Sequence, residues 1–180
     1  MENFYMLTKA DIEKYFIAEK HESLLFLVVG LAAVLLSLIF YFCVKTNMGR
    51  GAAIPLLLFG LIQAIAGYTV YQRSDDQRIN QVYAYDMNPG QLKIKELARM
   101  GKVNRNFDIY RRIEVGALAA GILFILIFRN DPSRYFWVGL GIALSIMAVE
   151  LFTADFIAAK RALVYTGLLE RFSNVRNVEM

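Results

Sequence analysis

Two long stretches of the chain contain no charged residue, and this feature limits the possible folds most. Residues 24–44 and 51–72 hold no Asp, Glu, Lys or Arg. At 1.5 Å per helical residue, each stretch is about long enough to cross a hydrocarbon core of roughly 30 Å. Hydrophobic residues make up 57% of the 180-residue chain and gather in such blocks. The pattern predicts an integral membrane protein rather than a soluble domain.

Two further apolar runs are shorter. The third run, 115–128, lies between Glu114 and Arg129, and the fourth begins at Tyr135 and meets Glu150. Flanking arginines can extend their side chains to the membrane surface, which lengthens the usable segment. The short polar stretch between the runs is typical of a turn. We therefore predict four spans, at about residues 24–44, 52–72, 113–129 and 135–156.

The distribution of Lys and Arg predicts the orientation. Three of them precede the first span, nine lie in residues 73–112 and four follow residue 159. The two short loops, 45–51 and 129–134, hold two each. Positively charged segments stay in the cytoplasm. We expect both termini and the central segment to be cytoplasmic, in a multi-pass protein of the plasma membrane, here the bacterial inner membrane.

The helices are predicted to continue beyond the membrane. Thr8 and Asp11 form a capping-box pattern, and apolar residues keep helical spacing through the flanks. Helices are predicted at about 9–44, 52–87, 91–128 and 135–172. Near-equal lengths and short turns favour an all-α, up-down-up-down four-helix transmembrane bundle over residues 1–180, with cytoplasmic extensions at about 9–23, 73–112 and 157–172. The alternative is that the flanks are separate surface helices, bent at the membrane.

The two halves of the chain are weakly similar. The segment FGLIQAIAG, residues 59–67, resembles VGLGIALSIM, residues 138–147. The similarity suggests two parallel hairpin repeats. The alternative, which we favour, is that apolar helices resemble one another by composition alone. Glycine, alanine and serine recur in both segments at spacings that allow close helix packing.

Acidic and basic residues are predicted to form a belt near the inner membrane surface. A carboxylate close to the membrane interior is costly and points to a function. In a hairpin that turns near residue 132, Glu150 lies level with Glu114. In a hairpin that turns near residue 48, Glu22 lies level with Ser74. The candidate residues are Glu22, Asp75, Asp76, Arg111, Arg112, Glu114, Glu150 and Asp155, with Gln63 nearer the midplane.

The belt has three interpretations. First, Arg111 and Arg112 pair with the acids of the neighbouring helix and fix the register of the bundle. Second, the belt is an ion or proton path in an oligomer, with Gln63 as a polar step. Third, the four helices hold a metal pair, but such sites also need Glu-x-x-His on two helices, and the chain has one histidine. We therefore expect no metal site.

Sequence motifs for catalysis are not found. The chain has no phosphate-binding glycine loop, no Gly-x-Ser-x-Gly, no His-Glu-x-x-His and no Cys-x-x-Cys. Cys43 and His21 are its only cysteine and histidine. We expect no cofactor, and a membrane enzyme is the least favoured class. The formal charge of +4 comes from basic residues interspersed with acids, which does not indicate nucleic-acid binding.

Two functional hypotheses remain. The favoured one is a non-catalytic membrane interaction or regulatory protein, such as an accessory subunit or an immunity-type protein, which binds a membrane or cytoplasmic protein through its helices. The alternative is an oligomeric ion, proton or small-solute transporter or channel that uses the acidic belt. Besides the lipid bilayer, the expected partners are therefore another protein and, for the alternative, further copies of the chain.

Overall fold

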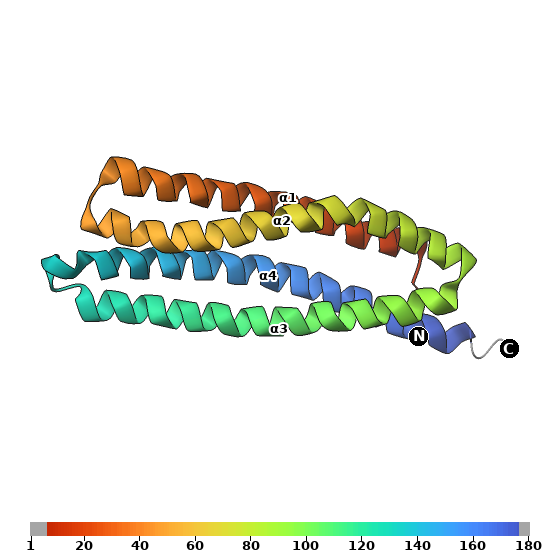
Figure 1. Cartoon of the computed structure of the whole chain (residues 1–180). Helices are drawn as coiled ribbons and strands as arrows, with labels where there is room; N and C mark the ends of the chain where they lie inside the picture. The colour runs from red at the N-terminus through yellow and green to blue at the C-terminus, as the bar shows by residue number, and fades with distance from the viewer. Residues whose placement is uncertain (1–6, 177–180) are drawn as a thin grey trace.

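The protein consists of four long helices, as the sequence predicts. The computed structural model describes residues 7–176, with side chains up to residue 172. The elements are α1 (Lys9–Ile39), which continues as the π-turn η1 (Phe40–Val44), α2 (Asn47–Met87), α3 (Pro89–Phe128), the 3-10 turn η2 (Pro132–Arg134) and α4 (Tyr135–Arg176). No strand occurs within the described residues. Figure 1 shows the four helices side by side along the length of the molecule.

Side-chain caps define where the helices begin. Thr8 and Asp11 form the predicted capping box at the start of α1. Asn88 caps α3, which begins with proline at residue 89. The side-chain oxygen of Thr46 accepts a hydrogen bond of 3.0 Å from the amide of Gly49 and so caps α2. This helix therefore begins five residues earlier than predicted. Residues 45–51 were expected to form a loop, but residues 47–51 lie inside the helix.

The helices pack in the order α1, α2, α4, α3 (Figure 1). α1 and α2 form one antiparallel hairpin, α3 and α4 form the second, and the hairpins meet mainly through α2 and α4. Contacts between α1 and α4 and between α2 and α3 are few. The arrangement is therefore two hairpins packed side by side, rather than a square bundle in which every helix has two equal neighbours.

Glycines allow the helix backbones to approach closely. A Cβ atom on Gly30 of α1 would lie 2.6 Å from the backbone nitrogen of Ala64 in α2. In the second hairpin, a Cβ on Gly121 would lie 2.7 Å from the carbonyl oxygen of Gly141. Both hairpins therefore cross at small residues, which confirms that this spacing serves packing within the chain. The duplication itself stays a prediction.

The two halves of the molecule bury different residues. We call residues 24–72 and 113–156 the apolar half, and 7–23, 73–112 and 157–172 the polar half. The polar half has a core of large side chains with at most 4% exposure: Leu7, Ile12, Tyr15, Phe16, Leu92, Met100, Tyr165 and Leu169. In the apolar half, large hydrophobic side chains face outward, among them Leu25, Leu35, Ile65 and Ile127 at 61–66% exposure.

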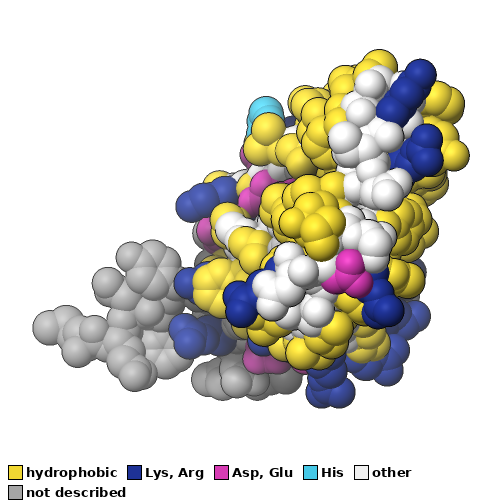
Figure 2. Space-filling view, turned by 90° about the vertical axis from the view of Figure 1, so that its left-hand side faces the viewer, with side chains coloured by type: hydrophobic (Ala, Val, Ile, Leu, Met, Phe, Trp, Pro, Cys, Tyr) yellow, Lys and Arg dark blue, Asp and Glu magenta, His cyan; other side chains and the backbone are white. Residues whose placement is uncertain are grey.

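The outward-facing apolar side chains suit a lipid environment. Figure 2 looks onto the end with the two short loops, where hydrophobic side chains lie around the charged and polar ones. Three helical segments are long and apolar enough to cross a membrane: Lys9–Val44, Asn47–Met87 and Pro132–Phe172. α3 does not reach this criterion, because its apolar run is limited to residues 115–128. Length and composition thus support three of the four predicted spans.

Candidate functional site

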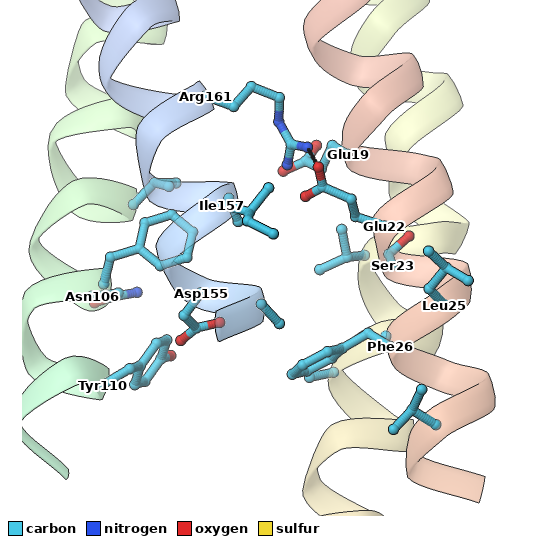
Figure 3. Close-up of a pocket in the computed structure, with 18 of the residues that line it drawn as sticks. Glu19, Glu22, Ser23, Leu25, Phe26, Asn106, Tyr110, Asp155, Ile157 and Arg161 are labelled. Atoms are coloured by element: carbon cyan, nitrogen blue, oxygen red, sulfur yellow. Dashed lines mark ion pairs between the residues drawn. The ribbon is translucent and has the colours of Figure 1, made fainter. Parts of the chain in front are cut away.

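The two hairpins separate near the middle of the molecule and enclose a cavity of about 420 Å³. A cavity of this size falls within the range of small-molecule sites, roughly 300–1,000 Å³. Figure 3 shows charged side chains at one end of it, apolar side chains along its length and Asp155 toward the other end. All four helices contribute to the wall, through residues within 19–29, 66–73, 103–110 and 150–161.

An ion pair between the hairpins closes the polar end of the cavity. Glu22 of α1 pairs with Arg161 of α4 (Figure 3). The guanidinium of Arg161 also lies 5.5 Å from the ring centroid of Tyr15. Together with the stacked rings of Tyr15 and Tyr165, this pair connects α1 and α4 at the polar end of the cavity.

Glu19 lies one helical turn from Glu22 and also lines the cavity. The residue is 9% exposed, and its buried Oε2 atom has no hydrogen-bond partner among the described residues. Burial raises the pKa of the Glu19 carboxyl, while Arg99, Arg73 and Arg161 act in the opposite direction. A buried carboxyl oxygen without a partner is costly, so Glu19 is a strong candidate for contact with a ligand.

A second ion pair supports this end of the cavity from within the polar core. The guanidinium of Arg99 donates two hydrogen bonds to Glu96, of 2.9 and 2.7 Å, and the amide of Gln81 donates a third of 3.0 Å. Glu96 is 1% exposed. Arg99 also lies 5.3 Å from the ring centroid of Phe16. These contacts hold the Glu96–Arg99 ion pair in one position inside the polar core.

Two stacked tyrosine rings also lie in this part of the polar core. The rings of Tyr15 and Tyr165 stack with centroids 4.2 Å apart and planes 12° apart. Burial, followed by the charge of Glu19, raises the pKa of Tyr15 to about 12. Burial also raises the pKa of Tyr165. Both phenols are therefore neutral at physiological pH, and the charge of this region comes from its carboxylates and guanidinium groups.

Three acids lie together at the deeper end of the cavity, within the apolar half. Gln63 of α2 donates a hydrogen bond of 2.9 Å to Glu150 of α4. The other carboxyl oxygen of Glu150 is buried without a partner. Glu114 of α3 is also buried, and its Oε2 atom has no hydrogen-bond partner among the described residues.

The prediction that Arg111 and Arg112 pair with the acids of the neighbouring helix is wrong. Arg111 lies 4.0 Å from Asp108 on its own helix, and Arg112 is exposed. In the part of the chain that the structure describes, neither forms an ion pair with Glu150 or Asp155. α3 presents both arginines to its outer surface, whereas Glu114, on the same helix, faces α4 and is 7% exposed.

The remaining belt residues lie outside the cavity. Asp75 forms an ion pair with Lys20 across the first hairpin, one residue from the predicted level, and a weaker one of 3.5 Å with Arg78. The hydrogen bond between Lys20 and Asp75 lowers the pKa of Asp75 and raises that of Lys20. Asp76 is exposed. Of the predicted belt, Glu22, Glu150 and Asp155 line the cavity.

Four charged residues of the region were missed by the sequence analysis: Glu19, Glu96, Arg99 and Arg161. Glu19 could have been found, because it continues the buried spacing of Ile12, Tyr15 and Phe16 by one turn. Glu96 and Arg99 are three residues apart in a helix, a spacing that predicts contact between their side chains. This spacing does not show whether such a pair is buried or exposed. The contact of Arg161 with Glu22 depends on how the hairpins pack, which the sequence does not indicate.

A metal site is not evident in the described residues. No group of three or more His, Cys, Asp or Glu side chains among them is arranged to hold a metal ion. His21 and Cys43 are exposed. The chemistry of the cavity is that of carboxyl and guanidinium groups at its ends and aliphatic and aromatic side chains between them.

The chain was compared with known proteins in three ways. No protein-family model matches it, no curated protein matches it, and no solved structure matches it. The function must therefore be inferred from the geometry of the molecule itself.

Proposed function

We propose that the chain is a four-span membrane protein whose cytoplasmic polar half binds another protein without catalysing a reaction. The fourth span is the apolar part of α3. It lies antiparallel to the apolar half of α4, so the two segments share one depth. Its side chains at positions 115, 122, 123, 126 and 127 are 45–66% exposed, as expected for contact with lipid.

The observation that supports partner binding is an exposed apolar stripe in the polar half. Ile79, Tyr83 and Met87 follow one another at four-residue intervals on α2 and are 60%, 64% and 66% exposed. Ile94, just beyond the α2–α3 turn, is 72% exposed. These residues lie beyond the membrane-spanning segments, so lipid does not cover them. Exposed apolar stripes of this kind mark protein interfaces, which are enriched in Tyr and Met.

Exposed basic side chains on α3 favour an acidic partner. The side chains of Lys95, Lys102 and Arg105 are exposed on α3, in the segment that follows Ile94. An amphipathic helix with an apolar face and acidic flanks would match both features. We therefore propose an acidic, helical segment of another protein as the occupant.

Photo-crosslinking in cells tests this proposal. A benzoyl-phenylalanine placed at Met87 should give one defined adduct with a second protein, and Tyr83→Lys should remove that adduct. The same probe at Glu13, which is exposed on α1, is the control and should give none. An adduct of twice the chain's own mass would replace the proposal with a homodimer. The absence of any adduct in an intact, folded protein would reject it.

A second function, proton or cation movement across the membrane, is favoured by the acids at the deeper end of the cavity. Glu114, Glu150 and Asp155 lie near one another in the apolar half. Groups of this kind serve as proton relays in membrane proteins.

Reconstituted vesicles test this second function. Purified protein in liposomes with an entrapped pH-sensitive dye should carry protons when a potential is applied. Flux should fall in Asp155→Asn but not in Asp108→Asn, which alters an exposed acid. Equal rates in vesicles with and without the protein would exclude the function.

A further inference from the structure

We propose that the cavity between the hairpins binds an organic cation with a hydrophobic body, such as a lipophilic onium or amine compound. The proposal stands apart from partner binding by the α2 stripe, because the two surfaces share no residue. It depends on three features of the cavity: its charge, its unpartnered oxygen atoms and its apolar wall.

The charge of the cavity favours a cation. Four carboxyl groups line it, those of Glu19, Glu22, Glu150 and Asp155, against the guanidinium groups of Arg73 and Arg161. The Glu22–Arg161 ion pair neutralises one group of each sign. The remaining side chains therefore have an excess of acid, and a cation between the hairpins would reduce the repulsion among them.

Two carboxyl oxygen atoms of the wall have no partner. Oε2 of Glu19, on a residue that is 9% exposed, and Oε2 of Glu150 are both buried without a hydrogen bond among the described residues. They come from different hairpins and lie toward opposite ends of the cavity. Protein interiors rarely leave such acceptors unpaired, so a ligand that supplies positive charge or N–H donors fits here.

The wall between these acids is apolar. The cavity is lined by Phe26, Val29 and Val70 of the first hairpin and by Phe107 and Ile157 of the second. Aromatic rings attract cations as well as apolar groups. A small inorganic ion would leave this surface uncovered, whereas a drug-sized ligand would cover it, since cavities of this volume hold such molecules. The wall therefore selects a bulky hydrophobic cation.

The test compares two probes of the same shape and opposite charge. Tetraphenylphosphonium and tetraphenylborate are titrated into the purified full chain in a neutral detergent, and binding is measured by equilibrium dialysis and calorimetry. We expect saturable binding of the phosphonium and at least about tenfold weaker binding of the borate. Equal binding of both ions, or binding that does not saturate, would overturn the proposal.

Variants locate the site. Glu19→Gln and Glu150→Gln keep the shape of the wall and should each weaken phosphonium binding by about tenfold or more. Ala154→Phe keeps all the charges but fills the cavity, and should also abolish binding. Glu13→Gln removes an exposed carboxylate from α1 outside the cavity and is the matched control. Each variant is first checked for its helical content and its elution volume.

The outcomes separate the proposal from nonspecific attraction. If the three cavity variants bind like Glu13→Gln, the cation binds elsewhere and the proposal fails. If Glu19→Gln does not fold, the pair Glu150→Gln and Ala154→Phe decides the question in the same assay. Loss of binding in both of these, with Glu13→Gln unchanged, would establish the cavity as the site.

Discussion

The guanidinium of Arg99 holds the carboxylate of Glu96 through two hydrogen bonds inside the polar half, where Glu96 is 1% exposed. Removing one partner leaves the other charge buried alone, which costs about 3–5 kcal/mol. We therefore expect Arg99→Met to lower the free energy of unfolding by about that amount, as measured by thermal denaturation in detergent. Arg111→Met removes an arginine from an exposed pair and should leave the melting temperature unchanged. Similar effects of both substitutions would contradict the structure.

The close approach of α1 and α2 at Gly30 predicts that alanine at two different glycines will have opposite effects on stability. Gly30→Ala places a Cβ atom 2.6 Å from the backbone of α2, so the helices must move apart and the protein should be destabilised. Gly116 on α3 has no atom within 4 Å of such a Cβ. Gly116→Ala should therefore stabilise the protein by about 0.5–1 kcal/mol. Melting temperatures of the two variants should move in opposite directions.

The buried carboxyl of Glu19 predicts a dependence of stability on pH. Its pKa in the folded protein lies above the ordinary value of 4.5, mainly because of burial. The folded state therefore holds the proton more tightly, and stability is lost as the pH rises through the folded pKa. Glu19→Gln removes this loss. It should raise the melting temperature at pH 8 and leave it nearly unchanged at pH 4.5.

The same measurement on Glu13→Gln is the control, since that carboxyl is exposed. Its melting temperature should follow that of the unmodified protein at both pH values. If Glu19→Gln were less stable than the unmodified protein at pH 8, the guanidinium groups around residue 19 would outweigh the cost of its burial.

The hydrogen bond between Gln63 and Glu150 connects the two hairpins within the apolar half. Gln63→Leu should lower stability by about 0.6–2 kcal/mol, the usual contribution of such bonds between membrane helices. Thr69→Val removes a hydrogen bond within α2, from Thr69 to the carbonyl of Ile65, and should have a smaller effect. Denaturation of both variants in the same detergent compares the two contributions.

The position of the α3–α4 turn distinguishes four spans from three. With Cys43 replaced by serine, Ser133→Cys should react with a membrane-impermeant maleimide in intact cells, because four spans put this turn outside. Asn88→Cys at the α2–α3 turn should react only after the membrane is opened. If α3 did not cross, the residue at position 133 would be protected as well.

The helices themselves were predictable, because apolar blocks, caps and turn residues act locally. Thr8 with Asp11 marked the start of α1 correctly, and the predicted end of the second helix at residue 87 agrees with α2. The level of the predicted belt was correct to within one residue at Asp75 and Lys20, since a short turn fixes the register of a hairpin. The start of α2 was missed because Gly51 is needed for contact with α4, a reason that lies outside the local sequence.

The site was less predictable because it depends on packing between hairpins. Depth along the helix axis placed Arg111 level with the acids, but the direction in which a side chain points depends on the rotation of the helix. That rotation is set by which face packs against a neighbour, here α4. The same limit applies to Glu19 and Arg161, which lie on different hairpins and line one cavity.

The pairing of α1 with α2 and of α3 with α4 has a consequence for biosynthesis. Each hairpin contains both partners of its own glycine crossing, so neither needs the other to bring its backbones together. The first hairpin can therefore enter the bilayer as a unit before the second hairpin is complete. The second hairpin can follow as another unit and dock afterwards through α2 and α4. The chain halves 1–88 and 89–180 should therefore reassemble when they are made separately in one cell, because each half contains both helices of its own hairpin.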